Sequence, residues 1–209
     1  MYNIRMEKIF SEKVINRLTL YHCILRDFLT EGKEYISSKQ IATLLRIDDS
    51  QVRKDINLLK YSGKSRVGYI VSDLKTSIEK SLGFEKTKKA CIVGAGNLGM
   101  ALAKYDNFTS YGLNIISLFD NDKNKIGTEI NSKKIIDINC FEKTVKADGT
   151  EIAILTVPGV HAQKTAKLIV KSNIKYIWNF TPTVLEVPQD VQVWNENLMG
   201  NFLQFTYNI

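Results

Sequence analysis

Three glycines at fixed spacing form the best candidate phosphate-binding segment in this sequence. They lie in Gly94-Ala95-Gly96-Asn97-Leu98-Gly99, which follows the apolar run Lys89–Val93 and precedes a helical pattern that continues to Tyr105. In this pattern the first glycine permits a tight turn, the second lets backbone N–H groups approach a pyrophosphate, and the third lets the helix pack on the strand. The helix N-terminus then favours the phosphate charge. We therefore expect residues 94–99 to bind a dinucleotide, the alternative being a glycine turn in another kind of α/β protein.

The next strand pattern ends in an aspartate that indicates which dinucleotide is bound. Asp120 closes the run Asn114–Asp120 and lies 21 residues after Gly99. A carboxylate there hydrogen-bonds the adenosine ribose hydroxyls and repels a 2′-phosphate, and no arginine follows it to offset that repulsion. The sequence therefore favours NAD(H) over the phosphorylated cofactor. A simple strand-end cap is the alternative for Asp120.

Two later strand patterns end in segments that are candidates for the nicotinamide half of the cofactor. Ligands of doubly wound sheets lie at the carboxyl ends of the strands. Proline after a strand is also ordinary turn chemistry, so neither segment is diagnostic alone. The candidate residues are Thr156, Val157 and Pro158 after one strand, and Asn179, Phe180 and Pro182 after the next.

A separate set of polar and basic residues in the N-terminal part is suited to DNA. A glutamine at the start of a recognition helix pairs with base edges, and arginine and lysine contact bases or phosphates. Basic residues in a following wing can enter the minor groove or neutralise the backbone. For each residue, a solvated surface charge is the alternative. The predicted DNA-binding residues are Ser50, Gln51, Arg53 and Lys54 on the helix, and Lys64 and Arg66 on the wing.

The elements that must position these DNA-binding candidates read as a winged helix-turn-helix domain over residues 1–82. An apolar stripe predicts a helix over Val14–Leu29, and N-cap residues precede two short helices, Lys39–Leu45 and Gln51–Leu59. The glycine-bounded segment Gly63–Val71 predicts a hairpin or wing, and Ser72–Leu82 a last helix.

The rest of the chain alternates strand and helix patterns, which predicts a Rossmann-like, doubly wound parallel sheet over residues 83–190. Residues 83–88 read as a linker, Glu151–Val157 and Ile174–Phe180 as strands, and Gly159–Lys171 as a helix. Residues 191–209 are predicted to hold a C-terminal strand and a helix with an apolar face. The expected fold class is therefore α/β with two domains and a C-terminal extension.

Composition limits the function classes further. Residues 1–82 hold 15 of the 29 basic and 10 of the 22 acidic residues, so most of the +7 net charge is N-terminal, as in a polyanion binder or a solvated surface. Three scattered cysteines, expected to be core filler, fit a reducing cytoplasm. With two histidines and no CxxC motif we expect no metal site. Apolar runs are too short for a membrane span, and residues 1–8 lack the apolar region of a signal peptide.

In sequence order, these motifs resemble the Rex redox-sensing transcriptional repressors. The resemblance runs from about Val14 to Tyr207. It implies a homodimer that senses the NADH/NAD⁺ ratio and releases DNA when NADH binds. It also implies that the helix after Asn197 is swapped between protomers. The motifs that carry it are the winged helix, Gly94–Gly99, Phe119-Asp120, Ile152–Pro158, Ala162-Gln163, Asn179-Phe180-x-Pro182 and Val187-Pro188.

The chain departs from the family pattern at several positions. Family members usually carry an arginine where this chain has Cys23 and an aspartate where it has Asn197, so the implied ion pair between the domains is absent. Leu58-Leu59-Lys60 replaces Tyr-Phe-Gly after the recognition helix. The wing reads Lys64-Ser-Arg66-Val-Gly-Tyr69 where Lys-Arg-Gly-x-Gly-Tyr is typical. The cofactor domain therefore matches the family better than the DNA-reading surface does.

Three functions are weighed against these observations. The favoured one is an NAD(H)-responsive DNA-binding repressor without enzymatic activity. A Rex-like paralogue that binds NAD(H) but acts through a protein partner is the main alternative. A small NAD-dependent dehydrogenase is disfavoured because the chain leaves no room for a second catalytic domain and shows no residue pair suited to proton transfer.

Overall fold

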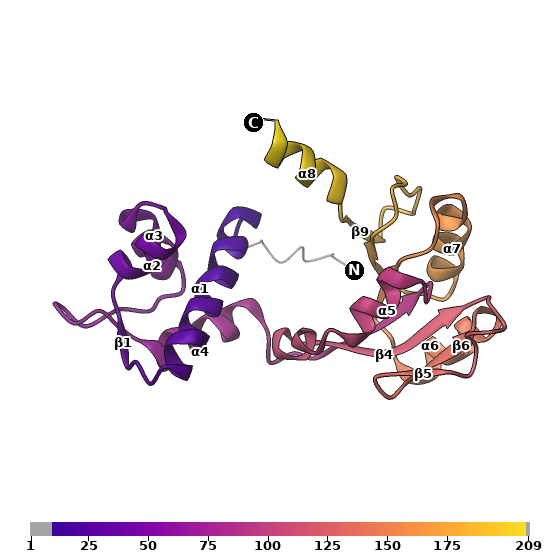
Figure 1. The fold of residues 1–209 in the computed structure, drawn as a ribbon, viewed down its shortest axis with the longest axis horizontal. Helices are drawn as coiled ribbons and strands as arrows, with labels where there is room; N and C mark the ends of the chain where they lie inside the picture. Colours follow the sequence, from indigo (N-terminus) through magenta and orange to yellow (C-terminus); the bar gives the residue numbers. More distant parts are fainter. Residues whose placement is uncertain (1–9, 208–209) are drawn as a thin grey trace, which may run out of the picture. The chain divides into compact units, whose positions relative to one another are not determined.

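The computed structural model describes residues 10–207 and divides into two compact units, Met1–Glu85 and Lys86–Ile209 (Figure 1). Residues 1–9, on which the absence of a signal peptide was predicted, and residues 208–209 lie outside the described part. Each unit is built around its own buried apolar side chains.

From residue 10 onward, the first unit contains four helices and a two-stranded sheet. The helices are α1 (Glu12–Thr30), α2 (Ser38–Leu45), α3 (Asp49–Leu58) and α4 (Val71–Leu82). Ser37 and Gln40 form a reciprocal capping box at the start of α2, and the Asp48 side chain accepts a hydrogen bond from Ser50 N to begin α3. Helix α1 packs against α4, and α2 against α3, so that α2 and α3 form the expected helix-turn-helix.

The wing differs in part from the predicted hairpin over Gly63–Val71. Strand β2 (Tyr69–Ile70) pairs antiparallel with β1 (Tyr35–Ile36), a segment for which no strand was predicted. Inside the predicted hairpin a single bridge joins Lys64 and Gly68, and Val71 already belongs to α4. Strands of two residues are too short to show alternation in a sequence, so this pairing could not be recognised.

The second unit is a seven-stranded sheet in the order β5-β6-β4-β3-β7-β8-β9. All neighbours are parallel except the edge pair β5 and β6. The strands are β3 (Lys88–Val93), β4 (Leu113–Asp120), β5 (Glu129–Ile130), β6 (Lys133–Asp137), β7 (Ile152–Leu155), β8 (Tyr176–Asn179) and β9 (Gln192–Asn195).

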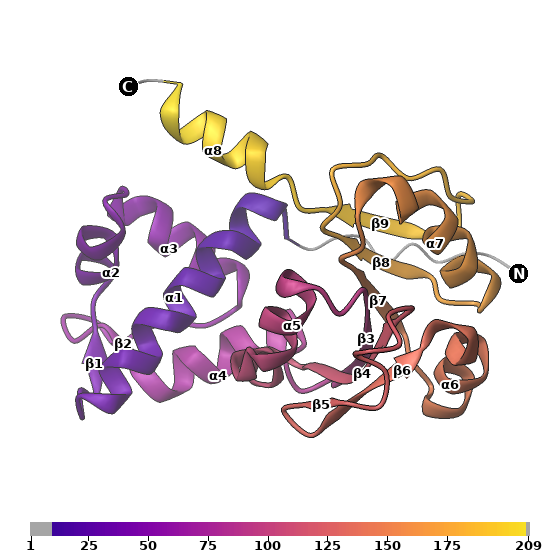
Figure 2. The same cartoon turned by 45° about the vertical axis from the view of Figure 1, so that its right-hand side comes forward.

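Helices cover both faces of this sheet, which confirms the predicted doubly wound α/β fold. Helix α5 (Asn97–Lys104) and a 3-10 helix (Asp106–Tyr111) contribute to the core on one face, and α6 (Phe141–Asp148) and α7 (Gly159–Lys171) to the core on the other. Strand β3 lies between β4 and β7, so the strands that follow it in sequence are added first on one side of it and then on the other. The strand order therefore reverses at β3, and a crevice opens at the carboxyl end of this strand. Figure 2 shows this part of the sheet with α5 and α7 beside it.

The last helix, α8 (Leu198–Thr206), has no buried residue. Its predicted apolar face is exposed, with Leu198, Phe202 and Phe205 at 57%, 53% and 75% exposure, and it lies beyond β9 in Figure 2. Across residues 10–207 no helix combines the length and apolarity that crossing a membrane requires.

Candidate nucleotide-binding site and DNA-binding surface

The glycine turn lies at the carboxyl end of β3, in the crevice where the strand order reverses. Gly94 has a φ of +106°, and an added Cβ would lie 2.9 Å from the backbone of Thr156 and Val157. An added Cβ at Gly99 would lie 2.1 Å from the Gly94 carbonyl oxygen. The turn therefore requires glycine at both positions, in the roles that the spacing predicts.

Gly96 differs because its surroundings are open. It is the N-cap of α5, and an added Cβ would meet nothing within 4 Å. The first backbone N–H groups of a helix have no partner inside the helix, and the helix dipole adds positive potential there. Open space in front of these donors is what a pyrophosphate needs.

Asp120 ties the turn to the end of β4. Its Oδ2 accepts a hydrogen bond from Ala95 N at 2.8 Å, and its Oδ1 accepts one from Asp122 N at 2.9 Å. Lys125 Nζ lies 3.5 Å from Oδ2, and the Asp120 residue is 9% exposed. The carboxylate is thus fixed at the crevice, and a cation that the sequence argument did not consider lies beside it.

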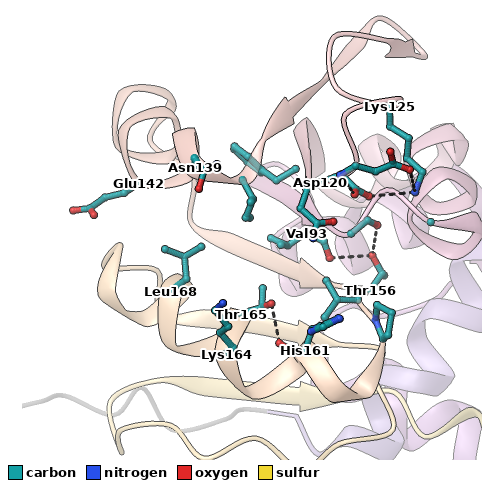
Figure 3. Close-up of a pocket in the computed structure, with 18 residues that line it drawn as sticks. Val93, Asp120, Lys125, Asn139, Glu142, Thr156, His161, Lys164, Thr165 and Leu168 are labelled. Carbon is teal, nitrogen blue, oxygen red and sulfur yellow. Dashed lines mark hydrogen bonds and ion pairs between the residues drawn. The ribbon is translucent and has the colours of Figure 1, made fainter.

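A pocket of about 730 Å³ opens in this crevice (Figure 3). Figure 3 shows Asp120 and Lys125 on one side and His161, Lys164 and Thr165 of α7 on the other. Of the predicted cofactor residues, those that line it are Gly94, Gly96, Asp120, Thr156, Val157 and Pro158.

The remaining predicted cofactor residues are not part of this lining. Asn179 is fully buried: its Nδ2 donates to Thr183 O and Asn195 Oδ1, and its Oδ1 accepts from the N–H and hydroxyl of Thr181. It thereby braces the loop after β8. For all the predicted cofactor residues outside the pocket lining, contact with the cofactor stays a prediction. These residues are Ala95, Asn97, Leu98, Gly99, Asn179, Phe180 and Pro182.

Sequence reasoning missed the pocket residues that come from α7 and the start of α6. The missed residues His161, Thr165 and Leu168 follow the predicted Pro158 at steps of three or four residues, so one face of α7 lines the pocket. That helical spacing, counted from the end of β7, is the signal that could have identified them. On the α6 side the lining comes from Ile138, Asn139 and Glu142.

The cysteines differ from the expectation of core filler. Cys91 is fully buried and burial raises the pKa of its thiol, whereas Cys140 is exposed and Cys23 is partly exposed. The expectation holds for Cys91 and is wrong for Cys140, because Cys140 lies at the N-cap of α6 rather than on a strand.

In the first unit, α3 is anchored by a buried carboxylate. Asp55 accepts hydrogen bonds from Arg17 Nε at 2.6 Å and Nη2 at 2.8 Å, from Tyr21 OH at 2.8 Å and from Gln51 Nε2 at 2.9 Å. Burial alone would raise the pKa of Asp55, but these hydrogen bonds outweigh it and hold the pKa below its ordinary value. Gln51, predicted to pair with a base, thus donates one N–H to its own helix.

The other predicted DNA-binding residues lie at the surface of this unit. Arg53 and Lys54 of α3 are exposed, as are Lys64 and Arg66 of the wing, and Ser50 is partly exposed. Arg66 has a φ of +63° and Lys60, after α3, one of +54°. These left-handed positions carry long basic side chains where the resemblance led us to expect glycine.

Two family models match the chain. "Putative DNA-binding protein N-terminus" matches residues 10–57, and "CoA binding domain" matches residues 85–183. The first match covers α1 to α3, and the second covers the pocket and most of the parallel sheet.

Curated relatives and solved structures match almost the whole chain. The redox-sensing transcriptional repressor Rex of Treponema denticola is 42% identical over 196 residues, which are 94% of this chain and 93% of that protein. The crystal structure of RSP in complex with NAD⁺ and operator DNA has a TM-score of 0.86 at 35% identity, covering 95% of this chain and 92% of that one. RSP in complex with NADH gives a TM-score of 0.84 at 35% identity, covering 97% and 95%.

Proposed function

The chain belongs to the Rex family of redox-sensing transcriptional repressors, and on this basis we propose which of its residues carry out that function. The protein binds NAD(H) and operator DNA and represses transcription in response to the redox state. One observation supports the assignment of roles most strongly: a glycine turn tied to Asp120 lies in a pocket of one unit, while the other unit is a winged helix with exposed basic residues.

In this proposal the pyrophosphate binds at Gly94 and Gly96, in front of the first turn of α5. Asp120 accepts hydrogen bonds from the adenosine ribose, and Thr156, Val157 and Pro158 contact the cofactor from the end of β7. The open space at Gly96 and the fixed carboxylate support this arrangement.

DNA binds through α3 and the wing, and NADH releases it. The proposed contacts come from Ser50, Gln51, Arg53, Lys54, Lys64 and Arg66, and the exposure of the four basic residues supports the assignment. The protein acts in the cytoplasm as a homodimer joined by α8 and catalyses no reaction. The exposed apolar face of α8 supports the dimer, since an isolated helix needs a surface on which to bury such a face.

A gel-shift of genomic fragments, with NADH, with NAD⁺ and without cofactor, at two salt concentrations, tests the proposal. We expect shifted complexes that NADH dissociates and that weaken steeply with salt, because each neutralised phosphate releases counterions. A protein–DNA complex whose affinity changes with neither NADH nor NAD⁺ would overturn the proposed response to the redox state. No complex on any fragment at low salt would favour the paralogue that acts through a protein partner.

A further inference from the structure

The guanidinium of Arg53 is held by partners from two helices. Arg53 Nη1 donates to Asp49 Oδ2, one helical turn earlier on α3, and Nη2 donates to Asp49 Oδ1 at 3.3 Å. Nη1 also donates to Ser38 Oγ of α2 at 3.4 Å. The two charged side chains are 50% and 40% exposed, so this arrangement lies at the surface that the helix-turn-helix presents.

These bonds use one edge of the guanidinium and leave the other edge available. A guanidinium has five N–H donors in a planar fork. Asp49 and Ser38 take both hydrogens of Nη1 and one of Nη2, which leaves Nε–H and the second Nη2–H on the same side of the group. Two parallel donors of this kind match O6 and N7 of guanine in the major groove.

The charges around Arg53 disfavour the competing ligand, a backbone phosphate. Asp48 and Asp49 place two carboxylates at the start of α3, and the hydrogen bonds from Ser50 lower the pKa of Asp48, which keeps it ionised. A phosphate close to Arg53 would face like charge from Asp49, whereas the edge of a guanine is uncharged.

We propose that Asp49 is a specificity-determining residue: it orients Arg53 to read a guanine and keeps it from the DNA backbone. The inference rests on the proposed DNA-binding role of α3. From the sequence alone, Arg53 could contact either a base or a phosphate, and this inference assigns it to a base. Asp49 is then a positioning residue that acts through Arg53.

The experiment selects binding sites from a duplex DNA library with a randomised centre, using the full-length protein. The proteins compared are wild type, Arg53→Lys, Asp49→Ala, Asp49→Asn and the control Asp27→Ala. Asp27 lies on α1 and its side chain is 66% exposed, so its replacement makes the same charge change away from Arg53. A second measurement is the salt dependence of binding to a duplex without the selected site.

Arg53→Lys keeps the charge but loses the planar fork, so the preference for guanine at one position should fall by roughly fivefold to 100-fold. Asp49→Ala and Asp49→Asn should weaken the same preference. On the duplex without the selected site, they should also steepen the slope of log K against log salt concentration by about 0.9, because the released Arg53 then contacts a phosphate. Asp27→Ala should change neither quantity.

Two outcomes separate this inference from the proposed function. If wild type selects a site and both Asp49 variants select it with the same guanine preference and the same salt dependence, the role of Asp49 is wrong while DNA binding stands. If wild type selects no site even at low salt, the DNA-binding function itself is wrong and the inference falls with it.

Discussion

At the scale of single residues, Gly96 is the position at which cofactor binding can be tested without disturbing the fold. The structure has room for a side chain there, but that room is where the pyrophosphate is proposed to lie. We expect Gly96→Val to fold normally and to lose NADH binding in isothermal titration calorimetry. Unchanged affinity in the folded variant would exclude this turn as the phosphate site.

Gly99 provides the contrasting variant. A Cβ at this position would lie 2.1 Å from the Gly94 carbonyl oxygen, so Gly99→Ala should lower thermal stability as well as binding. A Gly99→Ala protein as stable as wild type would mean that α5 is not held closely against the turn.

Asp120 and Lys125 together should set the preference for NADH over NADPH. The carboxylate repels a 2′-phosphate, whereas Lys125, 3.5 Å away, partly offsets that repulsion. NADPH should therefore bind much more weakly than NADH, and Lys125→Met should widen the difference by up to about 1 kcal/mol. The check is titration of both cofactors into both proteins. Equal affinity of wild type for the two cofactors would show that Asp120 does not face the ribose.

At the scale of elements, the position of α3 depends on Asp55, which joins it to α1 through Arg17 and Tyr21. Asp55→Asn removes the charge that the partly exposed Arg17 pairs with and disrupts the hydrogen bonds that the buried Asp55 side chain accepts, so the free energy of unfolding of the first unit should fall by about 2 kcal/mol. Both tryptophans, Trp178 and Trp194, belong to the second unit. Urea unfolding followed by circular dichroism should therefore register the loss, while tryptophan fluorescence reports the other unit. Equal stability of variant and wild type would contradict this role of Asp55.

The same carboxylate predicts a direction of pH dependence. The pKa of Asp55 is lower in the folded protein than in the unfolded chain. Its stabilising contribution is therefore complete above the unfolded pKa of about 3.9 and is lost as the pH falls through the folded pKa. The stability difference between wild type and Asp55→Asn should be largest near neutral pH and should shrink below about pH 4. A difference that grows on acidification would reverse the sign and refute the assignment.

Elements with regularly spaced apolar residues or a clear helix-capping residue could be predicted from the sequence. Short elements rich in polar residues could not. The sequence prediction for α7 matches the structure at both ends, because Pro158 precedes the helix and apolar residues recur along it. Strands β5 and β6 and helix α6 were not predicted, since Lys133-Lys134 begin β6 and polar residues separate Phe141 from the next apolar position of α6, Val145. In the site, the glycine turn and Asp120 were predictable from spacing, whereas Lys125 and the pocket face of α7 depend on how α7 and the loop after β4 lie across the crevice.

At the scale of the whole molecule, α8 is the element whose removal should change the assembly. Its apolar face is exposed within the chain, so a second copy is the proposed cover. Truncation after Glu196, which keeps β9 intact, should yield monomers in analytical ultracentrifugation and should uncouple DNA binding from NADH. A truncated protein that remains dimeric would place the dimer contact elsewhere.

Substitutions at Cys23 and Asn197 test how strongly NADH binding in one unit is coupled to DNA binding by the other. Asn197 caps α8 by accepting a hydrogen bond from Gly200 N at 2.9 Å, a role that aspartate also fulfils. We expect Cys23→Arg combined with Asn197→Asp to respond more sharply to NADH in DNA-binding titrations than either single variant does. Additive effects of the two substitutions would show that the positions do not meet in the dimer.

The hydrogen bond from Ala95 N to Asp120 has a consequence for how cofactor preference can evolve. The carboxylate proposed to reject a 2′-phosphate is also the acceptor that holds the phosphate-binding turn in place. A mutation that removes the charge in order to admit NADPH should therefore also loosen the turn proposed to bind the pyrophosphate, since even asparagine keeps only one acceptor oxygen for the N–H groups of Ala95 and Asp122. The preference for NADH over NADPH and the affinity for either cofactor thus depend on the same side chain. A change of cofactor would need a compensating substitution at the turn. If Asp120 has both roles, a single substitution there should change cofactor preference only at the expense of cofactor affinity.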